Sequence, residues 1–463
     1  MIEFYHKYFK KSYTQKIKEL AKDISRLLIL EEIETDDFTS YILPPELKEN
    51  ISDELWIKIN TLYSTLESRK SNLSITLKKY LIKNEINSKK EFKFIDIFAG
   101  CGGLSLGLNQ VGFNPILINE IEPKYLESYY FNHNLHISNY HCCDIKDISS
   151  NTNLLNLDID LVVGGPPCQG FSMANRQRLL DDPRNVLYKK YLELLSNVRP
   201  KFFIMENVKG MMNKYDEILN DFENIIGNDY SIDMVLLNAK DFGIPQNRER
   251  VFVIGSRKKS ASASQIISDV IKSSKNCKKF KLADALESLP ELKPKKVKNA
   301  RGIENNDIGY KFREYKYTPN DYLSFINSDS KINYLSNHTN RYNNDRDIEI
   351  FSRLPQGANS LHESIADIMP YSSRNHIFKD KYFKLNEKEV CKTITSHMKF
   401  DCNMYIHPNQ PRGLSPREAA RVQTFPDDFI FMGSNNIWYA QIGNAVPVKL
   451  AEAIGKEIIK YLK

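Results

Sequence analysis

The sequence predicts an α/β protein with a doubly wound, mostly parallel sheet, a smaller irregular domain and a helical N-terminal extension. Three observations support this. Short apolar strands alternate with amphipathic helical stretches from residue 92 to about 258, which is the pattern of βαβ units. The alternation then stops, and Lys, Asn, Ser, Tyr and Asp dominate up to about residue 410. The first 90 residues place apolar side chains at helical spacing, with a break at Leu43-Pro44-Pro45.

The chain therefore divides into three expected parts. Residues 1–91 form the helical extension, in which no helix-turn-helix signature is convincing and whose role is open. Residues 92–258 form the main α/β domain, completed by a C-terminal amphipathic helix within 436–463. Residues 259–435 form the second domain. A length of 463 residues fits more than one domain.

Composition excludes several classes of protein. The chain is 41% hydrophobic and 27% charged, as in globular proteins. It has no apolar run near the roughly 18 residues that span a bilayer, and its lysine-rich N-terminus does not resemble a secretory signal. Seven cysteines without a CxxC pair favour a reducing compartment and predict no metal site. We therefore expect a cytoplasmic protein without membrane association.

The net charge of +7 is unevenly distributed. Residues 271–346 carry 16 Lys and Arg against 9 Asp and Glu, so this stretch equals the net charge of the whole chain. A localised basic surface is expected of a protein that binds a polyanion, although a solvated lysine-rich face would have the same composition.

The strands of the main domain follow in order, and the ends of the first three carry the first candidate site. The six clearest are FKFIDIFAG (92–100), PILINEIE (115–122), DIDLVVGG (158–165), KFFIMENV (201–208), SIDMVLLNA (231–239) and RVFVIGS (250–256). Gly100, Gly102 and Gly103 follow the first strand, where a doubly wound sheet presents its ligand crevice. Ser105 stands where the dinucleotide fingerprint requires a third glycine, which disfavours NAD and FAD.

Two carboxylates indicate which ligand this crevice takes. Glu120 lies twenty residues after Gly100, at the spacing typical of a ribose-binding acid, and Asp144 ends the next expected strand. Each of them alone is more often a helix cap or a solvated surface group. Together with the glycines they favour an adenosine ligand without a pyrophosphate, namely S-adenosylmethionine.

A second group of residues predicts covalent chemistry. Cys168 lies in GGPPCQGFS (164–172), where two prolines stiffen the loop after a strand. A buried structural cysteine is the alternative, but such residues usually occupy apolar segments, so a nucleophile is favoured. Glu206 follows FFIM, where partial desolvation is expected to raise its pKa, or else it caps the next helix. Arg248 and Arg250 share one face of a strand and suit an anionic phosphate or a base carbonyl, or else surface ion pairs.

The ordered motifs FAGCGG, GGPPCQGFS, ENVKG, QNRERVFVIG, RGLSPREAARVQTFPDDF and QIGNAVP resemble those of cytosine-5 DNA methyltransferases of the bacterial modification type. The resemblance covers about residues 92–463. It implies an S-adenosylmethionine-dependent methyltransferase fold interrupted by a variable target-recognition region, with the C-terminal helix packed beside the first motif. The helical extension departs from the minimal members of the family.

The resemblance also implies roles for individual residues. Cys168 would be the nucleophile, Glu206 the acid that bonds ring nitrogen 3 of cytosine, and Arg250 the contact to the cytosine carbonyl. Arg248 and Ser172 would lie near the backbone of the flipped nucleotide. The expected cofactor-binding residues are Phe98, Gly100, Gly102, Gly103, Glu120, Ile121, Asp144, Ile145, Pro167, Leu187 and Asn444. Because Ile121 replaces an aromatic residue that is common there, adenine stacking would depend more on Phe98 and Ile145. The expected DNA contacts are Gln169, Ser172, Lys293, Lys295, Lys296 and Lys298.

We therefore expect a monomeric, sequence-specific enzyme that methylates a flipped-out cytosine in double-stranded DNA and releases S-adenosylhomocysteine without a metal. It would act in the bacterial cytosol near the nucleoid, where a cognate restriction endonuclease could act on the same site without a stable complex. Two alternatives stay open. An RNA (tRNA) methyltransferase is disfavoured because about 150 residues separate QNRERVFVIG from RGLSPREAAR. A catalytically silent DNA-binding regulator is disfavoured by the intact Cys168, Glu206 and Arg250.

Overall fold

The computed structural model describes residues 81–82, 91–133, 135, 139–149, 157–167, 186–298, 304–328, 331–370 and 381–463. Most of the extension at 1–91, and with it the helices expected there, lies outside the described residues. Its described residues include the short strand β1 (Leu81–Ile82), which pairs antiparallel with β11 (Lys331–Ile332).

The main sheet has seven strands among the described residues, in the order β4-β3-β2-β5-β6-β9-β7. They are β2 (Phe92–Ile97), β3 (Phe113–Asn119), β4 (Tyr140–His141), β5 (Leu161–Gly164), β6 (Phe202–Val208), β7 (Ser231–Asn238) and β9 (Glu249–Ser256). The pairs among β2 to β6 are parallel, whereas β9 is antiparallel to both of its neighbours. The predicted mostly parallel α/β sheet is confirmed. Strand order reverses between β2 and β5, where such sheets place their ligand crevice.

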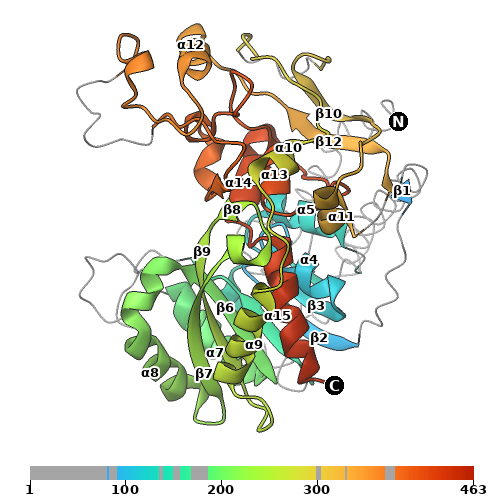
Figure 1. Cartoon of the computed structure of the whole chain (residues 1–463). Helices are drawn as coiled ribbons and strands as arrows, with labels where there is room; N and C mark the ends of the chain where they lie inside the picture. Colours follow the sequence, from blue (N-terminus) through green and yellow to red (C-terminus); the bar gives the residue numbers. More distant parts are fainter. Residues whose placement is uncertain are drawn as a thin grey trace, which may run out of the picture.

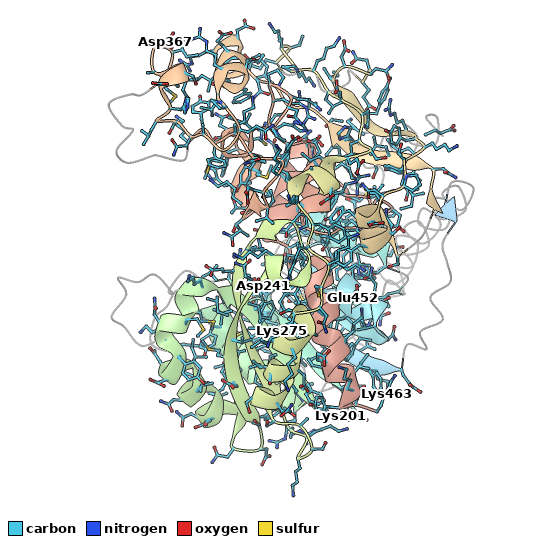
Figure 2. The ribbon with its side chains drawn as sticks, viewed as in Figure 1. Lys201, Asp241, Lys275, Asp367, Glu452 and Lys463 are labelled. Atoms are coloured by element: carbon cyan, nitrogen blue, oxygen red, sulfur yellow. The ribbon has the colours of Figure 1, made fainter. Side chains whose placement is uncertain are left out.

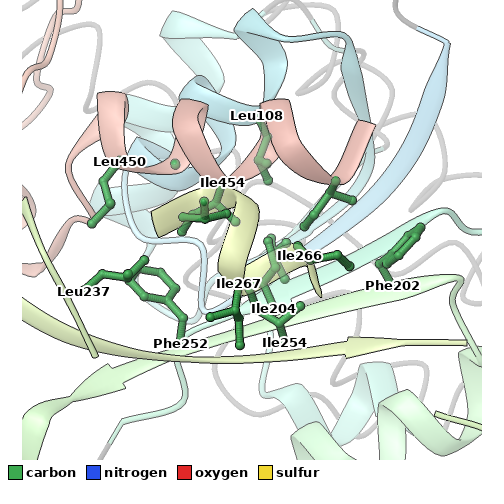
Figure 3. Packing of buried hydrophobic residues seen from close by; sticks show 14 of the residues in the cluster. Leu108, Phe202, Ile204, Leu237, Phe252, Ile254, Ile266, Ile267, Leu450 and Ile454 are labelled. Carbon is green, nitrogen blue, oxygen red and sulfur yellow. The ribbon is translucent and has the colours of Figure 1, made fainter. Parts of the chain in front are cut away.

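Helices cover both faces of this sheet, which explains why its strands read as nearly continuous apolar runs. On one face, the core includes Ile95, Ile97 and Val162 and is covered by α7 (Val186–Val198) and α8 (Tyr215–Ile226). The opposite face is covered by α4 (Gly103–Gln110), α9 (Ala263–Ser274) and α15 (Val448–Lys460). Figure 3 shows this second core, with Leu450 and Ile454 of α15 and Ile266 of α9 above the strands.

The C-terminal helix α15 lies beside α4, the helix that follows the first strand (Figure 1). Their close approach depends on glycine. A Cβ atom at Gly107 of α4 would lie 2.3 Å from the Val448 carbonyl oxygen, and one at Gly455 of α15 would lie 2.9 Å from Leu108. Gly107 therefore lets the backbone of α15 lie directly against α4, whereas Gly455 leaves room for the Leu108 side chain.

Helix α9 follows residue 258, where the βαβ alternation of the sequence stops and irregular structure is expected. That local expectation is wrong at 263–274, because Ser262 caps the helix by accepting a hydrogen bond from the Gln265 N–H, and Ile266 and Val270 are buried against the sheet. The serine-rich composition of SASASQ hid this amphipathic helix. The division of the chain into domains stays a prediction.

Residues 282–444, called here the second part of the chain, form short elements (Figure 1). Its strands are β10 (Gly309–Glu314), β12 (Tyr334–Thr339) and β13 (Cys391–Lys392); β10 pairs antiparallel with β12, and β13 pairs parallel with β8 (Gln246–Asn247) of the main domain. Its helices are α10 (Leu282–Leu286), α11 (Asp321–Asn327), α12 (Asp345–Arg353), α13 (Pro416–Val422) and α14 (Asn435–Asn444). Figure 2 places Asp367 at the tip of this part, where it pairs with Arg353 of α12.

The remaining elements are short. They are α5 (Pro123–Asn132), α6 (Ile145–Ser149) and the 3₁₀ turns Lys209–Lys214, Ala239–Phe242, Glu363–Ile365, Ser396–Lys399 and Asn403–Tyr405. Of the helices that the structure describes, none combines the length and the apolar character needed to cross a bilayer.

Helix α13 is fully buried between the two parts of the chain and carries buried ion pairs. The guanidinium of Arg412 donates to both carboxylate oxygens of Glu418, at 2.7 and 2.6 Å. Arg421 is paired in the same way with Asp427. These contacts explain why the apparently polar motif RGLSPREAARVQTFPDDF lies in the interior: each of these carboxylates has its own guanidinium partner.

Candidate active site

A cavity of about 560 Å³ opens at the carboxyl ends of the parallel strands. The segments that follow β2, β3, β4 and β5 and the last residues of β6 each contribute to its wall. Residues 395–396 and 443–446 close it from the other side. This is the crevice that a doubly wound sheet provides at its point of strand reversal.

Most of the sequence-predicted site residues meet in this one cavity. Its lining includes Phe98, Gly100, Gly103, Glu120, Ile121, Asp144, Ile145, Pro167, Leu187, Glu206, Arg248, Arg250 and Asn444. Gly102 is not part of the lining: it has φ +90°, and a Cβ atom there would lie 2.6 Å from the His133 ring, so it serves backbone conformation and packing. Cys168, Gln169 and Ser172 lie outside the described residues.

The turn after β2 is built around Glu120. Phe98 and Gly100 both have left-handed backbone angles, with φ of 56° and 57°. The turn brings the Gly100 N–H to 2.8 Å from Oε2 of Glu120, while the Glu122 N–H donates to Oε1 at 2.9 Å. Burial raises the pKa of Glu120, although these backbone hydrogen bonds oppose the shift. Each carboxylate oxygen keeps a further acceptor position for a ligand hydroxyl.

Asp96 lines the same cavity, although it is not among the site residues predicted from the sequence. It is 2% exposed, and the Ser105 hydroxyl donates to its Oδ2 at 2.5 Å. Burial raises the pKa of Asp96 from 3.8 to about 7, with Glu120 adding to the shift and the Ser105 hydrogen bond opposing it. An acid inside the apolar strand FKFIDI was the signal available in the sequence. Ser105, which replaces the third glycine of the dinucleotide fingerprint, is thus the hydrogen-bond donor to Asp96.

Another end of the cavity is formed by the segments after β3 and β4. Asp144 accepts the Lys146 N–H at 3.0 Å and so caps α6, the helix-cap role that was the alternative interpretation of this residue. Its side chain is 37% exposed, which leaves oxygen acceptor positions open. Ile145 is buried, whereas 62% of Ile121 is exposed. Phe98, Ile145 and Leu187 supply apolar surface to the cavity.

Glu206 and Arg250 form an ion pair in the cavity, with Arg250 Nε 3.0 Å from Glu206 Oε1 and little of either side chain exposed. Gly165 makes room for the carboxylate, because a Cβ atom there would lie 3.0 Å from Glu206 Oε2. The neighbouring Asn207 donates to the Pro166 carbonyl oxygen at 3.2 Å. That hydrogen bond attaches the loop that leads to position 168 to strand β6.

Arg248 differs from Arg250 in its surroundings. It is 1% exposed, and its guanidinium donates to the carbonyl oxygens of Ile394, Gly443 and Ala445 at 2.6, 3.2 and 3.1 Å. Burial and the nearby Arg250 lower the pKa of Arg248 to about 9. The expectation that Arg248 and Arg250 share one face of a strand is wrong, because Arg250 lies in β9 whereas Arg248 lies between β8 (Gln246–Asn247) and β9. The two guanidinium groups therefore have different partners.

The four predicted DNA-contact lysines lie away from the cavity. Lys293 pairs with Asp307 at 3.0 Å and Lys296 with Asp345 at 2.9 Å. Lys293, Lys296 and Lys298 are exposed, whereas Lys295 is half-buried. Lys298 lies over the Tyr342 ring at 5.9 Å. Burial, together with Lys311, lowers the pKa of Lys295. Exposed pairs of this kind contribute about 0–1 kcal/mol, so a phosphate could replace the aspartates. In the part of the chain that the structure describes, no cluster of His, Cys, Asp and Glu could hold a metal ion.

Comparisons with known proteins assign the family. Residues 92–460 match the model for C-5 cytosine-specific DNA methylases. The type II methyltransferase M.DdeI of Desulfomicrobium norvegicum is 32% identical over 397 residues, covering 80% of this chain and 89% of its own. M.XorII of Xanthomonas oryzae is 31% identical, covering 80% and 85%. A crystal structure from E. coli, assigned as a prophage-encoded DNA modification methyltransferase, superposes with a TM-score of 0.61 at 28% identity and covers 80% of this chain and 99% of its own. The chain belongs to the C-5 cytosine-specific DNA methylase family and is a DNA (cytosine-5-)-methyltransferase.

Proposed function

We propose that this enzyme is the modification methyltransferase of a type II restriction-modification system and transfers a methyl group from S-adenosylmethionine to a flipped-out cytosine through a covalent Cys168 adduct. Family membership implies the methyl donor and the DNA substrate. The observation that carries the residue-level proposal is the meeting of Glu120 with the Glu206–Arg250 ion pair in one cavity, beside the loop that leads to Cys168.

The lining of the cavity suits the methyl donor. Glu120 offers two carboxylate oxygens, already oriented by backbone N–H groups, to the ribose hydroxyls. Asp144 offers an acceptor to the adenine amino group, and Phe98, Ile145 and Leu187 supply apolar surface for the ring. When bound, S-adenosylmethionine supplies an electrophilic methyl group.

The other end of the cavity suits cytosine. The Cys168 thiolate adds to ring carbon 6, which breaks the aromaticity and makes carbon 5 nucleophilic. Glu206 donates a proton or hydrogen bond to ring nitrogen 3, and Arg250 donates to the carbonyl oxygen. After methyl transfer, carbon 5 loses its proton to a base, carbon 6 releases the cysteine sulfur and nitrogen 3 returns its proton. The base must leave the DNA stack to reach these groups, at a cost of a few kcal/mol.

Sequence recognition is assigned to residues 259–435, the recognition region. Lys293, Lys295, Lys296 and Lys298 contact phosphates there, and Gln169 and Ser172 approach the flipped nucleotide. We further propose that the enzyme acts as a monomer in the bacterial cytosol, and that a cognate endonuclease cleaves the same site without forming a stable complex with it. The role in a restriction-modification system is supported by the relatives named above, which are type II methyltransferases.

Trapping the covalent adduct tests the mechanism. Wild-type protein should form a denaturation-resistant adduct with duplex DNA that carries 5-fluorocytosine, because the fluorine at carbon 5 blocks the final elimination. Cys168→Ala should form no adduct and no 5-methylcytosine while still binding DNA. Cys277→Ala, at a half-buried cysteine outside the cavity, is the matched control and should behave as wild type. If Cys168→Ala still methylated DNA, as read by bisulfite sequencing, the proposal would be refuted.

A further inference from the structure

Three buried polar side chains join the main domain to the segments that close the cavity. Gln246, Arg248 and Gln423 are at most 1% exposed. Gln246 donates to the side-chain oxygen of Gln423 at 3.0 Å and accepts the Ile394 N–H at 2.9 Å. Gln423 donates in turn to the Ile442 carbonyl oxygen at 2.8 Å. The three side chains thus link strand β8, the segment after β13, and the end of α14.

Among these three side chains, Arg248 binds both the segment after β13 and the end of α14. One arm of its guanidinium donates to the Ile394 carbonyl oxygen, and the other donates to those of Gly443 and Ala445. The two segments also touch directly, because a Cβ atom at Gly443 would lie 2.1 Å from the carbonyl carbon of Thr395. A displacement of one segment must therefore displace the other.

Both segments also line the cavity, and the first of them is held by a further arginine, Arg341. Residues 395–396 and 443–446 line the cavity proposed for S-adenosylmethionine. The 3₁₀ turn Ser396–Lys399 is bound by an earlier segment of the recognition region, because Arg341 donates to the carbonyl oxygens of Met398 and Phe400 at 2.7 and 2.9 Å. Arg341 precedes Tyr342, whose ring lies under Lys298. A continuous chain of contacts therefore runs from the cavity wall to the proposed phosphate-binding surface.

We propose that Arg248 is a positioning residue that couples ligand occupancy of the cavity to DNA binding by the recognition region. The inference rests on the proposed function and assigns Arg248 a different role from the backbone contact implied by the family resemblance. A ligand that orders residues 395–396 and 443–446 also orders the rest of the recognition region, because the guanidinium fork holds both segments and Arg341 binds the turn that follows residue 396. Lysine cannot replace it, because an ammonium group is a point charge without the planar fork that reaches both segments.

Binding measurements with and without S-adenosylhomocysteine test this coupling. The wild-type protein should bind duplex DNA more tightly when the cavity is filled, by a factor in the usual range of about 5 to 150, and DNA should tighten S-adenosylhomocysteine binding by the same factor. Arg248→Lys should reduce both factors to near 1 while still binding each ligand alone. Arg257→Lys is the matched control, because Arg257 also donates to backbone carbonyl oxygens, those of Pro200 and Arg199, but lies outside the cavity lining. It should keep the wild-type factor.

The outcomes separate the coupling from the chemistry. The coupling is refuted if Arg248→Lys keeps the wild-type factor, or if the wild-type protein shows none. Should Arg248→Lys fail to fold, Gln423→Asn provides the second variant, since it withdraws the bond to Ile442 and should lower the factor in the same way. Failure of the proposed function would appear instead as methylation by Cys168→Ala, a readout that does not depend on these binding measurements.

Discussion

Replacing Glu120 with alanine should weaken S-adenosylmethionine binding far more than DNA binding. Glu120 is 8% exposed, and its carboxylate is held by the N–H groups of Gly100 and Glu122. In the proposed complex it accepts hydrogen bonds from both ribose hydroxyls. The substitution removes these two acceptors and leaves the Glu206–Arg250 end of the cavity unchanged.

The size of the effect follows from the contacts. A hydrogen bond to a charged group contributes about 1.5–3 kcal/mol, so two of them give roughly 3–6 kcal/mol, or about 10²- to 10⁴-fold in Kd. Two factors favour the lower end. Burial raises the pKa of Glu120, which means that the unliganded protein bears a desolvation cost that alanine removes. Water can also enter the enlarged cavity and satisfy the Gly100 and Glu122 N–H groups. We therefore expect a loss of about 10²-fold.

Calorimetric titration of S-adenosylmethionine, together with KM values for both substrates, measures the effect. Asp147→Asn is the matched control, since it removes an exposed acid from α6 outside the cavity lining, and it should retain wild-type affinity. The reasoning is refuted if Glu120→Ala binds S-adenosylmethionine within threefold of wild type. It is refuted equally if KM for DNA rises as much as KM for S-adenosylmethionine.

Three further predictions concern other parts of the molecule. Glu206→Gln keeps the shape of the side chain but cannot deliver a proton, so kcat should fall by about 10²- to 10⁴-fold with DNA affinity preserved; a loss below tenfold in single-turnover assays would contradict the role. Burial on folding raises the pKa of Asp96 from 3.8 to about 7, so between these pH values the folded protein binds one more proton than the unfolded chain. The free energy of unfolding should therefore fall by up to about 4 kcal/mol as the pH rises from 4 to 7, and then level off. Asp96→Asn should lose this part of the pH dependence in thermal unfolding measured from pH 5 to 8, and an unchanged profile would exclude Asp96 as its source. Lys298→Ala should weaken binding to all DNA sequences alike and lower the slope of log K against log salt by about 1, whereas Lys272→Ala on α9 should not; a change in sequence preference would count against a phosphate contact.

The sequence predicted the sheet and the composition of the cavity because both depend on local patterns. Each long strand of the main domain is an apolar run of its own, and the carboxyl ends of the parallel strands β2 to β6 lie at the same sheet edge. The spacing from Gly100 to Glu120 therefore led to a contact that the structure contains, the hydrogen bond from the Gly100 N–H to the carboxylate. Cys168 and the helices of the extension stay predictions, since they lie outside the described residues.

Tertiary structure alone decided the features whose partners are distant in the chain. The carbonyl groups that receive Arg248 lie 146 to 197 residues away, so no local pattern distinguishes Arg248 from Arg250. Asp96 acquires its raised pKa from burial, and Lys296 acquires Asp345 as a partner from a segment about 50 residues further on. Sequence by itself determined the family, the strand pattern and the residue types of the site, because these follow from short motifs and periodicity. The packing determined which charges are buried and what each one contacts, because desolvation and pairing depend on segments that meet only in the folded chain.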